Sequence, residues 1–328
     1  MGFTQAVVIS SLVFLVLSLP FHESGRLIQS PLTVRNIRQR HFAFASLLAI
    51  SVIVFWTPLR TIAALSWTDD RYSHLLLIPL ISAFLLYFER GRVFSQPTDR
   101  RGAAVSLLLA AAAVYALSVL TPLGTGYRIA GMILSTVLVW AGAFALCYGT
   151  GVFRAAAFPL GFLAFMIPLP ESVLNWIIHA LQSASADTSA VLFRVVGIPS
   201  FRNGFRFQLP GVEIEIASEC SGIRSTFALV LVSVLAGYVL LRSPYGRICL
   251  ALAAIPIGIF KNAVRIVALS YLGVYVDRAY LDGKLHHQYG GLVFSSLSLL
   301  LVIPLILLLR RLDSKPLVAP LDAAPRSY

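Results

Sequence analysis

Cys220 is the residue of this sequence best suited to covalent chemistry. It stands in the polar segment 218–225 (SECSGIRS), directly before an apolar run that predicts a helix. A thiol at a helix start is favoured as the nucleophilic thiolate, because the helix dipole and unpaired N–H groups attract negative charge. Ser221 and Gly222 are small enough for a substrate to approach the backbone, and Arg224 would add positive charge one turn on.

A cysteine can also be a small buried residue or a helix cap. We prefer that interpretation for Cys147 and Cys249, because both stand in apolar runs. For Cys220 the polar neighbours favour a role as a reactive nucleophile.

Arg265 is the second candidate, because it interrupts a long apolar run. Lys261 and Asn262 precede it by four and three residues, so a helix would carry all three on one side. Helical rise places Arg265 about 10 Å from the end of that run. A guanidinium at such depth is costly and usually functional: it can hold a thiolate, an oxyanion or a substrate carboxylate, although it cannot act as a base. A structural ion pair with Glu171 or Glu219 is the alternative.

Three histidines stand beside apolar runs. His286 and His287 precede the last run, and either imidazole could protonate a leaving amine near neutral pH. His74 precedes an earlier run and could line a path for the substrate; for each histidine the alternative is an ordinary polar residue at a membrane interface. Two histidines and one cysteine fall short of the four closely spaced ligands that zinc prefers, so we expect no metal and no cofactor.

The composition places these residues in a membrane protein. Of the 328 residues, 58% are hydrophobic and 12% are charged, whereas roughly a quarter are charged in a soluble domain. A disordered chain and a soluble globule are therefore excluded, and three cysteines exclude a disulfide scaffold. The net charge of +12 does not indicate nucleic acid, because the basic residues form short clusters between apolar runs.

The apolar runs predict an all-α polytopic membrane protein with about nine transmembrane helices, because a spanning helix needs about 20 mostly apolar residues. The first run is short, ends at Pro20 and has no sign of a cleaved signal peptide. If the spans alternate, the basic clusters lie on one side, which is then cytoplasmic, as is the carboxyl terminus. The expected spans are residues 5–21, 41–57, 73–88, 103–121, 127–148, 153–169, 223–241, 246–272 and 289–309.

The polar segments 170–222 and 273–288 are then expected on the extracytoplasmic side. The first begins as an amphipathic, broken helix at the membrane interface. Alternating residues on both sides of Pro210-Gly211 then predict a small β-hairpin before Cys220.

Three consecutive spans would thus carry Cys220, Arg265 and a histidine to one face of the membrane. A cysteine, a histidine and a third group that stabilises charge are the parts needed for covalent acyl transfer. The alternative is a non-enzymatic transporter or flippase that binds an anionic substrate with Arg265, although the sequence lacks the internal repeats typical of such proteins. A serine or metal protease is the least favoured interpretation, because the motifs Gly-x-Ser-x-Gly and His-Glu-x-x-His are absent.

Three motifs, in this order and at this spacing, resemble those of the exosortase/archaeosortase family. They are ECSGIRS at 219–225, NAVRI at 262–266 and HHQYG at 286–290, followed by Phe294. The resemblance extends over roughly residues 40–310. It implies an exosortase-like transmembrane core at 41–311. The residues before it predict a membrane segment with a basic cytoplasmic loop at 1–40, and the composition after it predicts a disordered cytoplasmic tail at 312–328.

The resemblance implies a cysteine protease or transpeptidase in the inner (plasma) membrane, with its active site on the extracytoplasmic face. Its substrates would be exported proteins with a carboxy-terminal sorting signal: a Pro-Glu-Pro-like motif, a transmembrane helix and a basic tail. A thioester acyl-enzyme would pass to an unknown acceptor, in contact with membrane lipid and without nucleic acid or cofactor. The motifs assign catalysis to Cys220, Arg265 and His286, with His286 preferred to His287 because His-x-x-x-Gly and a following aromatic residue fit it. The supporting or substrate-binding residues would be Glu219, Ser221, Gly222, Arg224, Asn262, His287 and His74.

Overall fold

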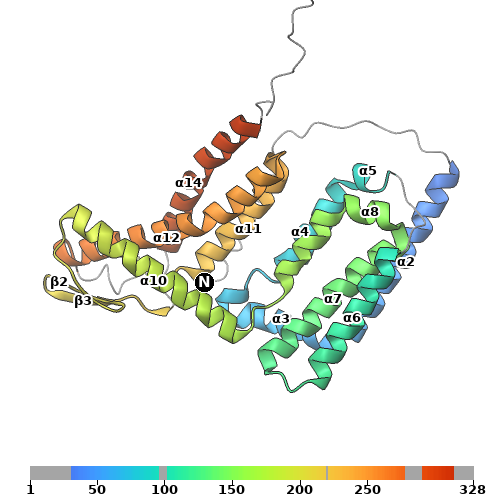
Figure 1. Cartoon of the computed structure of the whole chain (residues 1–328), viewed down its shortest axis with the longest axis horizontal. Helices are drawn as coiled ribbons and strands as arrows, with labels where there is room; N and C mark the ends of the chain where they lie inside the picture. The colour runs from blue at the N-terminus through green and yellow to red at the C-terminus, as the bar shows by residue number, and fades with distance from the viewer. Residues whose placement is uncertain (1–30, 96–101, 219–220, 278–289, 314–328) are drawn as a thin grey trace, which may run out of the picture. The chain divides into compact units, whose positions relative to one another are not determined.

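The computed structural model describes residues 31–95, 102–218, 221–277 and 290–313 (Figure 1). The chain divides into two compact units, one ending at Asn175 and the other beginning at Trp176.

The N-terminal unit is helical, and its longest helices pack closely along one another. Gly131 and Gly142 on α7 allow this packing, because a Cβ at these positions would lie 2.1 Å from Ser118 Oγ and 2.9 Å from the Leu108 side chain of α6. The Trp140 indole Nε1 of α7 donates a hydrogen bond to Ser51 Oγ of α2 at 2.8 Å. The elements are α2 (Pro31–Val54), α3 (Trp56–Thr68), η1 (Asp70–Tyr72), α4 (Leu77–Phe88), α5 (Arg90–Val93), α6 (Gly102–Leu120), α7 (Thr125–Tyr148), α8 (Thr150–Ala155), α9 (Ala157–Phe162) and η2 (Leu163–Met166).

The C-terminal unit combines long helices with a small antiparallel sheet of order β1-β2-β3. Its elements are α10 (Glu171–Val196, of which the first residues belong to the N-terminal unit), β1 (Phe201–Asn203), β2 (Arg206–Leu209), β3 (Val212–Glu215), α11 (Ile223–Leu240), α12 (Pro244–Tyr275) and α14 (Gly290–Asp313). Helices α11, α12 and α14 share an apolar core that includes Leu229, Leu250 and Val302.

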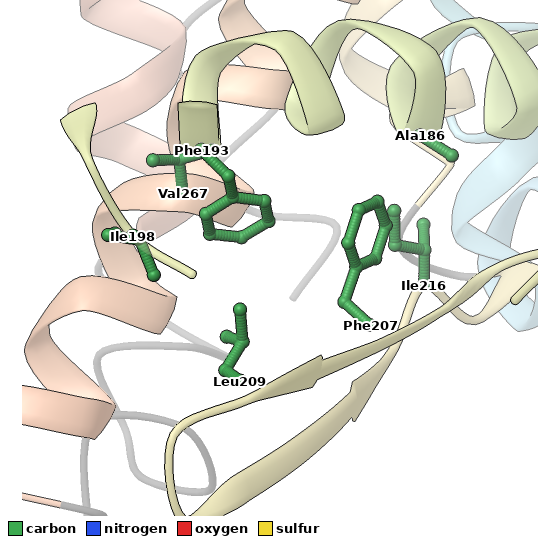
Figure 2. Close-up of a cluster of buried hydrophobic side chains, with 7 residues drawn as sticks. All are labelled: Ala186, Phe193, Ile198, Phe207, Leu209, Ile216 and Val267. Carbon is green, nitrogen blue, oxygen red and sulfur yellow. The ribbon is translucent and has the colours of Figure 1, made fainter. Parts of the chain in front are cut away.

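The sheet packs against α10 through a compact apolar cluster (Figure 2). The rings of Phe193 on α10 and Phe207 on β2 lie 5.3 Å apart, and both side chains are fully buried. Val267 of α12 joins the cluster. The cluster therefore ties the sheet, α10 and the part of α12 near Arg265 together.

The mostly helical architecture confirms the predicted fold class. Within the described ranges, six helices are long and apolar enough to cross a membrane, or up to seven if a bent pair counts as one span. The nine expected spans are thus not all found, and the first, at 5–21, lies outside the described residues. The six segments are Ile37–Val54, Asp70–Phe88, Gly102–Leu120, Thr125–Tyr148, Ile223–Leu240 and Pro244–Tyr275.

The prediction of one continuous span at 153–169 was wrong. The structure has α8, α9 and η2 there, and the pair Ala157–Met166 and Glu171–Val196 is bent by 92°. Pro159 explains the first break, because it lacks an N–H for the carbonyl of Ala155 and its ring clashes with that carbonyl. Pro168 and Pro170 end the segment for the same reason.

The segment after Pro170 also differs from the prediction. Helix α10 is unbroken over 26 residues, in keeping with the lack of proline and glycine between Glu171 and Val196. The predicted hairpin is present as β2 and β3, joined at Pro210-Gly211, where Gly211 has φ 74°. A third strand, β1, pairs with β2 and was not predicted.

Candidate active site

The start of α11 adopts a backbone conformation that requires glycine. Gly222 precedes the helix with φ +78°, in the left-handed region that favours glycine. A Cβ there would also lie 2.9 Å from Cγ of Asn262. Glycine is therefore needed at position 222 for two reasons: it allows the turn into α11, and its lack of a Cβ allows α12 to approach closely.

Hydrogen bonds fix the residues around this turn. Ser225 Oγ donates to the Gly222 carbonyl at 3.0 Å, and the Ile223 N–H donates to Ser221 Oγ at 3.4 Å. The Ser221 N–H donates to the carbonyl of Ser218 at 3.2 Å. The residues that flank positions 219 and 220 are thereby held close together, and Ser221 is 1% exposed.

One face of α12 contacts the first turn of α11 at three successive positions. A Cβ at Gly258 would lie 2.5 Å from Thr226 Oγ1, so only glycine allows this approach. Lys261 Nζ donates to Ser225 Oγ at 2.5 Å. Asn262 lies against Gly222. As the numbers rise along α12 the partners fall along α11, so the two helices run antiparallel here, and Arg265 occupies the next position on the same face of α12.

The polar groups of this face lie away from solvent. Lys261 is 3% exposed and Asn262 is 1% exposed, while Arg265 and Arg224 are partly buried. Asn262 Nδ2 donates to Ser185 Oγ of α10 at 3.1 Å. Burial of such polar side chains is costly unless hydrogen bonds offset their desolvation.

The structure brings together part of the predicted site. Ser221, Gly222 and Asn262 meet at the junction of α11 and α12. Glu219, Cys220, His286 and His287 lie outside the described residues. His74 belongs to the N-terminal unit, next to α4, and its role stays a prediction.

No group of three or more metal-ligating side chains occurs in the part of the chain that the structure describes. The polar groups gathered there are hydroxyls, an amide, an ammonium and a guanidinium, which suit anions and carbonyl oxygens better than a metal ion.

A family model described as transmembrane exosortase matches residues 66–303, well over half of the chain. The chain belongs to the transmembrane exosortase family. This confirms the resemblance noted in the sequence. The match spans α11, α12 and the motifs at 219–225, 262–266 and 286–290. No curated protein and no solved structure matches the chain.

Membership of the exosortase family makes this a multi-pass membrane protein and implies a membrane sorting transpeptidase. It also implies substrates with a carboxy-terminal sorting signal of the Pro-Glu-Pro type.

Two contacts of this exosortase chain were missed from the sequence. Lys261 was noted only as a neighbour of Arg265, and its bond to Ser225 was not foreseen. Ser185 looked like one polar residue of an amphipathic helix, yet it is 0% exposed and bonded to Asn262. The available signal was the spacing of Gln182, Ser185 and Ser189, which puts them on one face of α10.

Proposed function

We propose that this chain is a cysteine transpeptidase that removes carboxy-terminal sorting signals, with Cys220 as nucleophile, Arg265 as the group that stabilises negative charge and His286 as proton donor. The observation that carries the proposal is the register between α12 and the start of α11. Gly258, Lys261 and Asn262 contact positions 226, 225 and 222 in turn.

Continuation of this register favours an encounter between Arg265 and the residues just before Gly222. Cys220 is bonded to Ser221, and consecutive Cα atoms are only about 3.8 Å apart. The bond from the Ser221 N–H to the Ser218 carbonyl holds the two described residues on either side of positions 219 and 220 close together. The placement of a guanidinium one turn beyond Asn262 therefore supports its action on this thiol.

The proposed reaction has two steps. The Cys220 thiolate attacks the carbonyl carbon of the scissile peptide bond, and the carbonyl oxygen becomes an oxyanion that Arg265 stabilises. The C–N bond then breaks, the leaving amine takes a proton from His286 and a thioester remains on Cys220. An acceptor amine, or water, attacks the thioester and releases the thiolate, and its proton returns to His286.

Arg265 suits this role because it is partly buried. Charge interactions strengthen where water is scarce, so a guanidinium there stabilises a thiolate or oxyanion by several kcal/mol more than it would in bulk water. The clusters of Arg and Lys on the opposite loops support an extracytoplasmic location for the reaction. An exported protein held by its tail helix would present its cleavage site there.

Co-expression of the enzyme with a tagged exported protein that ends in a sorting signal tests the proposal. Cys220→Ala and Cys220→Ser are expected to abolish tail removal while the protein still inserts in the membrane. Arg265→Lys is expected to be severely impaired, because an ammonium lacks the planar fork of a guanidinium. Cys147→Ser and Cys249→Ser are the matched controls and should process the substrate normally. Full processing by Cys220→Ala would refute covalent catalysis by this thiol.

A further inference from the structure

The segment that carries Cys220 is attached at both of its ends to one helix, α10. Upstream, Gln182 Nε2 donates to the carbonyl of Ile216 at 2.5 Å. Downstream, Asn262 connects α10 to Gly222: its Nδ2 donates to Ser185 Oγ at 3.1 Å, and its Cγ would lie 2.9 Å from a Cβ on Gly222. The chain is thus attached to α10 on both sides of positions 219 and 220, at Ile216 and at Gly222.

The two attachment points on α10 are three residues apart, on one helical face. Gln182 is 9% exposed and Ser185 is 0% exposed, so neither bond competes with solvent. Farther along the helix, Phe193 packs on Phe207 of the sheet that leads into the segment (Figure 2). Helix α10 is therefore joined at three places to the elements that precede and follow the segment.

We propose that Gln182 and Ser185 are positioning residues for the nucleophile. Gln182 acts through the carbonyl of Ile216, and Ser185 acts through Asn262. Neither touches the reacting atoms; together they fix where the segment 217–221 presents Cys220 relative to Arg265. This proposal rests on the proposed function for its chemistry, and its geometry is testable without the reaction.

Positioning has a large effect in catalysis of this kind. A displacement of about 1 Å in a reacting group can lower the rate by about 100-fold. Loss of either bond leaves the fold largely supported by the apolar cluster, because neither Gln182 nor Ser185 is part of that cluster. Variants at Gln182 and Ser185 should therefore have a lower rate of tail removal but a normal amount of folded enzyme.

Ser189 provides a matched control on the same helix. It is 0% exposed, one turn beyond Ser185, and its Oγ has no hydrogen-bond partner among the described residues. Ser185→Ala and Ser189→Ala thus remove the same buried hydroxyl, but only the first removes a bond to the site. A merely structural role for Ser185 would lower the amount of folded enzyme, because Asn262 Nδ2 loses its acceptor, and would leave kcat per folded enzyme equal to that of Ser189→Ala.

The kinetic experiment is a double-mutant cycle on the rate of tail removal per folded enzyme. Ser185→Ala is expected to lower kcat by about tenfold with KM unchanged, since positioning affects the step and not substrate binding. In the Asn262→Ala background the same change should have less than about a twofold effect, because Ser185 acts through Asn262. Gln182→Met, which keeps the length of the side chain, should lower kcat in both backgrounds. Equal kcat values for Ser185→Ala, Gln182→Met and Ser189→Ala would overturn the proposal.

A second measurement separates this proposal from the proposed function. A membrane-impermeant maleimide is applied to a Cys147→Ser, Cys249→Ser chain without substrate, and the rate of labelling at Cys220 is followed against pH. If α10 holds the thiol beside Arg265, then Ser185→Ala and Gln182→Met should shift the labelling profile to higher pH, and Ser189→Ala should not. This shift without any tail removal by the parent chain would support positioning and refute the transpeptidase. Tail removal that needs Cys220, with unchanged profiles in all three variants, would overturn positioning alone.

Discussion

Replacement of Gly222 by alanine has two effects: it strains the backbone at a left-handed residue, and it displaces Asn262 in the site. The alanine must adopt φ +78°, which costs about 1–2 kcal/mol of folding free energy. Its Cβ would also lie 2.9 Å from Asn262 Cγ, whereas ordinary contacts begin near 3.4 Å, so Asn262 must move by about half an ångström. That movement would disturb the 3.1 Å bond from Asn262 to Ser185, because hydrogen bonds weaken with small changes in distance and angle.

The magnitude follows from the geometry. If about 1 Å of misplacement lowers the rate about 100-fold, half of that distance predicts a loss of about tenfold in kcat. Gly197→Ala is the matched control, because Gly197 has φ +77° and a Cβ there would meet nothing within 4 Å. Both variants bear the same backbone strain, and Gly222→Ala should lose further thermal stability because its Cβ also presses on Asn262.

The assay measures tail removal per folded enzyme beside the thermal unfolding of the purified protein in detergent. Gly222→Ala is expected to be about tenfold slower than Gly197→Ala per folded enzyme. Equal activities in the two variants would refute the view that the contact between Gly222 and Asn262 positions the site.

Two further predictions concern the support of the helices. Gly258→Ala places a Cβ 2.5 Å from Thr226 Oγ1, so overpacking should cost about 1–3 kcal/mol; thermal unfolding measures it, and an unchanged midpoint would contradict the close packing of α11 on α12. Asp313 Oδ2 accepts hydrogen bonds from the N–H groups of Arg242 and Ser243 at 3.1 and 3.3 Å. Asp313→Asn should therefore lower stability by about 1 kcal/mol, and an unchanged midpoint of thermal unfolding would contradict the role of Asp313 at the start of α12.

Hydropathy predicted the long helices well because length and apolar content are sufficient for a span. It failed at 153–169, where the runs are apolar but Pro159 interrupts the backbone hydrogen bonds. It also missed β1, although Asn203-Gly204 is a turn signal between short strands and Gly204 has φ 61°. The mean hydropathy of a segment does not register the effect of such single residues on the local backbone.

The site was predicted unevenly for a related reason. The motif at 262–266 led to Asn262, and the structure shows what it contacts. Gln182 and Ser185 were missed, because polar residues on an amphipathic helix look the same in sequence whether they face water or a buried carbonyl. Their partners, Ile216 and Asn262, lie far away in sequence, so pairwise spacing carries no signal for them.

The antiparallel pair α11–α12 has a consequence for an enzyme that works in a fluid bilayer. Gly258, Lys261 and Asn262 join the two helices on the same face that bears Arg265. When lipids of different thickness tilt the pair, both helices tilt as one body. The guanidinium and the residues at the start of α11 then move together, so the distance between them does not change with the thickness of the bilayer.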